Sequence, residues 1–301
     1  MTELTREQWL AERRRGLGGS DAGAVLDINP YRSRVDVYLD KTGQAEDVAS
    51  NELMYWGNVL EAVVADEFCK RTGKQVIRRN KILEHPKHPW MLGNVDRLVL
   101  NEDAGLECKT ANDHAAHRWG PDGSQEMPGE YVAQCAHYMA VTGRSKWYVA
   151  VLIGGNDFRW YELDRDPTLE AEMVEEMRAF WFDNVLARVA PEPREARDIE
   201  AIFPVDDGST VQGTVEIITA VRELKRVKAQ LKEVDGRKES LETIIKGYMK
   251  DAQILLADGK KAATWKTSET TRIDTTALKQ EEPETAERFS RTTSSRRFLV
   301  K

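Results

Sequence analysis

Two apolar segments joined by a short polar turn constrain the fold of this chain most strongly. Residues 90–100 (WMLGNVDRLVL) and 106–110 (LECKT) are mostly apolar, and residues 101–105 (NEDAG) between them are typical of a turn. This pattern predicts a strand, a turn and a second strand, which together form a β-hairpin. Because apolar residues flank each polar position, we expect the hairpin to lie in a central sheet rather than at its rim.

The predicted hairpin carries three charged side chains that can meet. Glu107 and Lys109 are two residues apart and so point to the same face of a strand, and Asp96 reaches that face if the hairpin closes around Gly105. Paired carboxylates suit Mg²⁺ or Mn²⁺. A neighbouring lysine can stabilise an attacking hydroxide or the charge of a phosphorane. The pattern therefore predicts metal-dependent phosphodiester hydrolysis, with a solvated hairpin face as the alternative.

The first two thirds of the chain alternate between helical and strand patterns, which predicts an α/β fold. A glycine-rich turn is expected over residues 16–19, and Ser20 is expected to be the N-cap of the helix that follows it. We expect strands over residues 75–83, 147–152 and 158–163, and helices over residues 3–15, 20–26, 35–41, 51–72, 130–142 and 168–189.

The pattern changes after the prolines at positions 191 and 193. Following a linker near residues 190–213, apolar residues recur at heptad spacing from Ile217, which predicts one long helix or a helical hairpin bent at Asp235-Gly236. A short β-hairpin is expected at Asp258-Gly259, followed by a polar tail with a basic end. We therefore predict a core domain over residues 1–205 and a C-terminal extension over residues 206–301.

Composition indicates a soluble, cytoplasmic protein. Charged residues make up 32% of the chain, the mean hydropathy is -0.57, and the charged N-terminus lacks the apolar stretch of a secretory signal. No apolar run approaches the roughly 18 residues of a membrane span. The sparse cysteines, without CxxC spacing, indicate reduced thiols rather than disulfides or zinc. The net charge of -7 leaves DNA open as a partner, because the basic stretches are local.

Four ordered stretches resemble the YqaJ-type viral recombinase family, relatives of phage lambda exonuclease within the PD-(D/E)xK nuclease superfamily. They are residues 13–22 (RRRGLGGSDA), 56–61 (WGNVLE), 94–110 (NVDRLVLNEDAGLECKT) and 131–139 (YVAQCAHYM). The resemblance spans about residues 10–190. It implies a PD-(D/E)xK nuclease core, a central mixed β-sheet flanked by helices, to which the long helix and hairpin are appended. One departure is Val95, where the superfamily has proline before the aspartate.

The resemblance implies a role for each matching residue of the metal centre. Asp96, Glu107 and the backbone carbonyl of Cys108 are implied as metal ligands, Glu61 as an additional carboxylate, and Lys109 as the catalytic lysine. Without the resemblance, Glu61 reads as an ordinary polar position on an amphipathic helix.

Further matching residues are implied to contact DNA or to support the lysine. Gln134 resembles the glutamine that positions the lysine or the scissile phosphate, and Tyr138 lies one helical turn on. Arg13 and Ser20 match positions that hold the 5′-phosphate of a strand end, which a helix N-terminus with an arginine favours. The alternatives are helix packing for Gln134 and Tyr138, and a plain N-cap serine with a surface arginine.

The implied function is a metal-dependent 5′→3′ exonuclease that generates 3′ single-stranded overhangs on linear duplex DNA for phage-type homologous recombination. Mg²⁺ is the implied cofactor, with Mn²⁺ as the alternative. The implied partners are DNA ends, a single-strand annealing recombinase and further copies of the chain in a trimer. The implied setting is the cytoplasm of a bacterium that carries the phage or prophage. Alternatives are an endonuclease or RecB-like nuclease of the same superfamily, or a non-catalytic DNA-binding scaffold.

The heptad helix allows three interpretations: self-association, docking of a partner, or contact with DNA. Our hypothesis from the sequence is that residues 215–301 contact the annealing partner or DNA.

Overall fold

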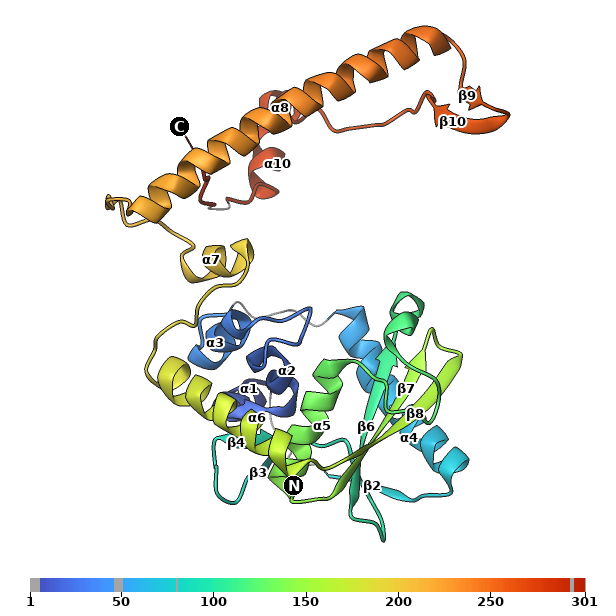
Figure 1. Ribbon diagram of the computed structural model, residues 1–301, viewed down its shortest axis with the longest axis vertical. Coiled ribbons are helices and arrows are strands. Elements are labelled where there is room, and N and C mark those ends of the chain that lie inside the picture. Colours follow the sequence, from blue (N-terminus) through green and yellow to red (C-terminus); the bar gives the residue numbers. More distant parts are fainter. Residues whose placement is uncertain (1–5, 46–50, 80, 293–294, 301) are drawn as a thin grey trace. The chain divides into compact units, whose positions relative to one another are not determined.

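The computed structural model describes residues 6–45, 51–79, 81–292 and 295–300 (Figure 1). The chain divides into two compact units, Met1–Ile202 and Phe203–Lys301, whereas the sequence analysis places the boundary after residue 205. Among the described residues, no helix has both the length and the apolar character needed to cross a bilayer.

A mixed β-sheet lies at the centre of the first unit. Its strand order is β2-β5-β6-β7-β8, in which β6 and β7 are parallel and the other neighbours are antiparallel. The predicted hairpin is β5–β6, and the predicted strand pair that follows is β7–β8, so both are confirmed. The strands are β2 (Val76–Arg78), β5 (Arg97–Val99), β6 (Ala104–Ala111), β7 (Lys146–Ile153) and β8 (Asp157–Asp164).

A smaller sheet, in the order β1-β4-β3, corrects three local predictions. The strand predicted over residues 75–83 is two strands, β2 and β3 (Leu83–Glu84), in different sheets, and the strand predicted over residues 90–100 divides into β4 (Met91–Gly93) and β5. The predicted glycine turn contains β1 (Leu17–Gly18), which pairs with β4 in parallel. A Cβ at Gly16 would lie 2.2 Å from the carbonyl oxygen of Trp90, so this glycine permits close approach of two backbones.

The predicted helices are present, with boundaries set by local caps. The Asn51 side chain accepts a hydrogen bond from the backbone N–H of Met54 and begins α4, which ends at Gly73 in the left-handed conformation. Residues 3–5 of the first predicted helix lie outside the described residues. The helices are α1 (Arg6–Arg14), α2 (Gly19–Val25), α3 (Arg34–Thr42), α4 (Glu52–Thr72), the 3₁₀ helix η1 (Asp113–Arg118), α5 (Gly129–Thr142) and α6 (Pro167–Ala179), which continues as the π-helix η2 (Phe180–Leu186).

Helices cover both faces of the central sheet (Figure 1). On one face, Met139 of α5 packs in a cluster with Trp147 and Val149 of β7. On the other, Phe68 of α4 packs in a cluster with Leu106 of β6. The first part of α4 departs from the amphipathic expectation, because most of its large apolar side chains are exposed: Leu53, Met54, Tyr55, Trp56, Val59 and Val63.

The second unit is dominated by the 35-residue helix α8 (Val215–Met249). The helix is continuous through residues 235–236, so the prediction of one long helix is confirmed and the alternative of a bent helical hairpin is wrong. The predicted hairpin is confirmed as β9 (Ile254–Ala257) and β10 (Lys260–Thr264), joined by Asp258 and Gly259, both with positive φ. The linker contains α7 (Ala196–Ile202), and the polar tail contains α9 (Thr275–Glu281) and α10 (Pro283–Arg288).

Candidate active site

The β5–β6 hairpin brings Asp96 and Glu107 together. Asp96 directly precedes β5, and the strand register pairs Arg97 with Leu106. Continuing this register by one residue places Asp96 opposite Glu107, with both side chains on one face. The Oδ2 atom of Asp96 accepts a hydrogen bond from the backbone N–H of Cys108 at 2.8 Å, which fixes the carboxylate across the hairpin.

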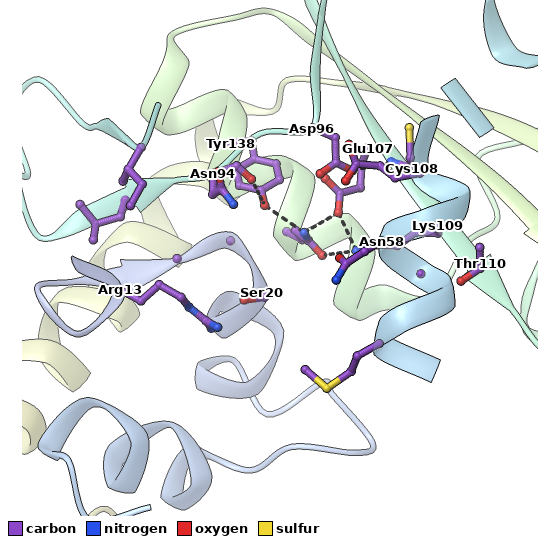
Figure 2. A pocket seen from close by; sticks show the side chains of 18 of the residues that line it. Arg13, Ser20, Asn58, Asn94, Asp96, Glu107, Cys108, Lys109, Thr110 and Tyr138 are labelled. Carbon is purple, nitrogen blue, oxygen red and sulfur yellow. Dashed lines mark hydrogen bonds and ion pairs between the residues drawn. The ribbon is translucent and has the colours of Figure 1, made fainter. Parts of the chain in front are cut away.

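The Glu107 carboxylate contacts both Lys109 and Gln134, and Figure 2 shows Glu107 and Lys109 side by side in the cavity. Glu107 Oε1 accepts from Lys109 Nζ at 2.6 Å and from Gln134 Nε2 at 2.7 Å. The Gln134 Oε1 atom accepts from Lys109 Nζ at 3.1 Å, so the amide of Gln134 bridges the carboxylate and the ammonium. Glu107 Oε2 is buried and has no hydrogen-bond partner within the described part of the chain.

Tyr138 anchors this cluster to the break between β4 and β5. Its hydroxyl donates to the carbonyl oxygen of Asn94 at 3.0 Å and accepts from Gln134 Nε2 at 3.0 Å. Because Asn94 lies where the chain leaves one sheet and enters the other, this contact positions the backbone just before Asp96. Asn94 lies in the stretch that carries the resemblance, but no role was predicted for it, because a contact to a backbone carbonyl leaves no sequence signal.

The pKa values of the site are set by two buried carboxyl groups that lie next to one ammonium group. Burial and the neighbouring Glu107 raise the pKa of Asp96 well above its ordinary value, although the Cys108 N–H and Lys109 oppose this. Burial alone would lower the pKa of Lys109, but Glu107 and Asp96 raise it above its ordinary value. Lys109 is therefore held as a cation beside the two carboxyl groups.

Glu61 lines the same cavity but pairs with a different group. Its carboxylate forms an ion pair with the guanidinium of Arg97, which is buried. In the described ranges, no group of three or more histidine, cysteine, aspartate or glutamate side chains is arranged to hold a metal ion. The structure thus brings Asp96 and Glu107 together but leaves Glu61 with Arg97, a residue that sequence reasoning missed although it directly follows Asp96.

The donor set formed by Asp96 and Glu107 fits a hard divalent cation. Both groups offer carboxylate oxygens, and the buried Oε2 atom of Glu107 has no partner among the described residues. Cys108 lines the same cavity, and its thiol points away from the two carboxylates, which leaves the backbone carbonyl as the group predicted to contribute (Figure 2).

The cavity extends from these carboxylates to the start of α2. Its volume is about 560 Å³, and its lining includes Arg13 at the end of α1 and Ser20 in the first turn of α2. The N-cap of α2 is Gly18, not Ser20, because the helix begins at Gly19 and Gly18 is extended; the Asp21 side chain accepts a hydrogen bond from the Gly18 N–H at 2.8 Å. The prediction of Ser20 as a cap is therefore wrong, and its hydroxyl is exposed at the cavity instead.

A buried charge network supports this end of the cavity. Asp21 forms ion pairs with Lys41 at 2.7 Å and Arg32 at 2.5 Å, and Lys41 Nζ also donates to the carbonyl oxygen of Arg13 at 2.9 Å. Burial would raise the pKa of Asp21, but Lys41 and Arg32 hold it far below its ordinary value. Asp21 thus anchors the backbone of Arg13 through Lys41. The sequence alone predicts no role for Lys41 or Arg32.

A central mixed sheet that carries Asp96, Glu107 and Lys109 at one hairpin defines the PD-(D/E)xK class of fold. Residues 8–145 match the YqaJ-like viral recombinase domain family. Over 308 aligned residues, the chain is 37% identical to "Uncharacterized protein YqaJ" of Bacillus subtilis (strain 168), covering 100% of this chain and 95% of that protein. This chain belongs to the YqaJ family.

Comparison with solved structures confirms the predicted fold. The alkaline exonuclease from Laribacter hongkongensis superposes with a TM-score of 0.51 at 22% identity, covering 61% of this chain and 94% of the exonuclease. A phage-related exonuclease from Haemophilus somnus has a TM-score of 0.45 at 13% identity, covering 57% and 96% of the two chains. The first match shows that the predicted core, a mixed sheet with flanking helices, has the same fold as that protein.

Proposed function

We propose that this protein is a Mg²⁺-dependent deoxyribonuclease that degrades the 5′-terminated strand of linear duplex DNA and leaves 3′ single-stranded overhangs. The observation that carries the proposal is the contact of Glu107 with both Lys109 and Gln134, next to Asp96, in a cavity that also reaches Arg13 and Ser20. The same cavity thus holds the acidic and basic groups for phosphodiester hydrolysis and the groups suited to binding a terminal phosphate.

In this proposal Asp96 and Glu107 hold the metal ion, with the carbonyl of Cys108 contributing. Mn²⁺ is an alternative, because the same oxygen donors suit both ions. When bound, the ion neutralises phosphate charge and lowers the pKa of water. Glu61 can join the ligands through its second carboxylate oxygen, in competition with Arg97, whose guanidinium engages the first.

Lys109 supplies the fixed positive charge of the proposed reaction. Its ammonium is held by Glu107 and Gln134, so hydrogen bonds to the scissile phosphate need no large rearrangement of the side chain. The oxygens of the pentacoordinate transition state carry more negative charge than those of the phosphodiester substrate. A prepositioned cation therefore stabilises the transition state more than the ground state. Tyr138 acts through Gln134, whose amide it holds.

The proposed 5′→3′ polarity depends on the other end of the cavity. In this proposal a terminal 5′-phosphate binds the guanidinium of Arg13 and the hydroxyl of Ser20, which both line the cavity near the start of α2. A strand whose 5′ end is held there presents a nearby phosphodiester to the acidic cluster.

The setting of this activity is also proposed. We infer a phage- or prophage-encoded enzyme in the bacterial cytoplasm that works with a single-strand annealing recombinase, as the resemblance implies, and that assembles as a homo-oligomer, for which a trimer is the expectation. Residues 215–301 are proposed to contribute to binding that partner or DNA. Removing them without changing DNA cleavage or partner binding would contradict this assignment.

The test uses linear duplex DNA labelled at the 3′ end of one strand, whose 5′ end is either phosphorylated or a free hydroxyl. With Mg²⁺, progressive shortening of the labelled strand shows 5′→3′ degradation, whereas immediate release of labelled mononucleotide shows the opposite polarity. Lys109→Ala is expected to abolish cleavage. Cutting of a closed circular duplex would indicate an endonuclease, and no cleavage with Mg²⁺ or Mn²⁺ would overturn the proposal.

Two pocket variants test the 5′-phosphate site. Arg13→Gln and Ser20→Ala are expected to lose the preference for a phosphorylated end while cleaving the hydroxyl-ended substrate as before. Arg15→Gln is the matched control, because Arg15 pairs with Glu12 and Glu84 on the surface. Equal loss on both substrates would show that Arg13 and Ser20 do not recognise the phosphate.

A further inference from the structure

The helix α8 carries an exposed apolar stripe along its whole length. Residues at the first and fourth positions of each heptad, a and d, are predominantly apolar, and the stripe is open to solvent, with Val234 62% and Tyr248 79% exposed. Its members are Ile217, Ala220, Leu224, Val227, Leu231, Val234, Leu241, Ile245 and Tyr248, with Lys238 as the polar exception. An isolated helix gains little stability in water, and a stripe of this kind marks an interaction surface.

The charges beside the stripe identify what covers it. In a parallel coiled coil, a residue at position g of one helix lies next to position e of the following heptad on the other helix. Placing two copies of α8 in register sets Glu223 beside Lys228 of the other copy, and Arg237 beside Glu242. Both pairs are attractive, and symmetry repeats each of them on the other side of the coil.

The opposite orientation is less complementary. If two copies overlap along the whole helix in antiparallel fashion, Glu223 faces Ile244 and Val221 faces Glu242. The antiparallel arrangement thus has two kinds of charged–apolar contact and one attractive pair, Lys228 beside Asp235. The parallel one has two attractive pairs and one charged–apolar contact, Glu216 beside Val221. The charge pattern therefore distinguishes the two orientations and favours the parallel one.

We propose that α8 packs along its apolar stripe against α8 of a second copy of this chain, parallel and in register. Within one chain, Glu223 forms an ion pair with Arg226, and Glu242 forms one with Lys246. These ion pairs are exposed and add little stability, so little is lost when the two carboxylates pair with the other copy instead. Lys238 at position a fixes the register. In register, both lysines lie in one layer of the coil, whereas a shift of one heptad would place a lysine in each of two apolar layers. The inference is independent of the proposed nuclease activity.

The orientation is tested by disulfide crosslinking of the full chain. Ala220→Cys places a thiol at position d near the start of α8, where two copies meet only in the parallel, in-register arrangement. Ala229→Cys is the matched control on the outer face of the same helix. Under mild oxidation, we expect a covalent dimer from Ala220→Cys and not from Ala229→Cys. Equal yields from the two variants, or none from Ala220→Cys, would overturn the proposal.

The charge pairing is tested by reversal. Glu223→Lys or Lys228→Glu alone sets like charges against each other, and each is expected to weaken association in sedimentation experiments by about tenfold. The combined variant Glu223→Lys/Lys228→Glu restores the attraction. It is expected to recover association and, in an Ala220→Cys background, to recover the disulfide crosslink as well. Failure of the double variant to recover either would contradict the pairing, as would a wild-type stripe that binds only DNA or another protein.

Discussion

Arg97 is ion-paired with Glu61, across the gap between the β5 strand and helix α4. The two residues flank the acidic cluster, and Arg97 also donates to the carbonyl oxygen of Asp96 at 2.8 Å. Glu61 can therefore serve either as a metal ligand for which Arg97 competes or as a lasting partner of the buried Arg97 cation. The two roles have different consequences for metal binding.

Substituting each partner separately distinguishes these roles. If Glu61 becomes a ligand, Glu61→Gln weakens Mn²⁺ binding measured by calorimetry, whereas Arg97→Gln leaves it unchanged or tighter because the competitor is gone. Glu61→Gln also leaves Arg97 without its partner, at a cost of about 1–3 kcal/mol in the free energy of unfolding. If both variants lose stability and neither changes metal affinity, Glu61 is a structural partner only.

Gln134 provides a test of how Lys109 is oriented. Gln134→Leu removes the amide that bridges Lys109 and Glu107 but keeps the direct ion pair between them. We expect kcat on linear duplex DNA to fall about 10–100-fold with little change in KM, as for other residues that orient reacting groups. Tyr138→Phe, which keeps both bridging contacts, should lose less. If activity falls only in proportion to the fraction of protein that is folded, Gln134 has a packing role and does not orient Lys109.

The sequence predicts best the contacts between residues that are close together along the chain. The hairpin of Asp96, Glu107 and Lys109 followed from strand patterning and a turn, because neighbouring strands fix their own register. The helices predicted over residues 35–41 and 51–72 end next to Gly43 and Gly73, where glycine adopts the left-handed conformation of a C-terminal cap. The resemblance added Gln134, whose contact with Glu107 joins residues that no local pattern relates.

Contacts between distant segments explain what the sequence did not show. The glycine-rich segment before Ser20 suggested a turn, yet Leu17 and Gly18 pair with β4, and this pairing shifts the helix cap to Gly18. A Cβ on Gly19 would lie 2.6 Å from the ring of Tyr138, a packing constraint invisible in a single sequence. Likewise, Lys41 and Arg32 meet Asp21 only in the folded chain.

The Asp21 network is expected to be costly to break. Asp21→Asn removes the charge that Lys41 and Arg32 share and leaves Lys41 buried without its counterion, so we expect a loss of about 3–5 kcal/mol in urea unfolding. Asp40→Asn is a milder control, because Asp40 meets Arg32 nearer the surface and its loss should cost about 1 kcal/mol or less. Comparable losses in the two variants would contradict this account of the network.

His137 is expected to make stability depend on pH in the mildly acidic range. The residue is fully buried on α5, where its Nε2 contacts the carbonyl oxygen of Leu92, and burial lowers its pKa from 6.5 to about 4. Between these values the unfolded chain binds a proton that the folded chain does not. The stabilisation is therefore complete above pH 6.5 and is lost as pH falls towards 4, with a total of about 3 kcal/mol.

The contribution of His137 is isolated by comparison with His137→Gln, which cannot titrate in this range. Carboxyl groups change stability over the same pH interval in both proteins, so the difference between their unfolding free energies reports the histidine. We expect this difference to shrink by about 3 kcal/mol from pH 7 to pH 4, because only the wild-type unfolded state gains the proton. Parallel stability curves for the two proteins would show that His137 titrates alike in the folded and unfolded chains.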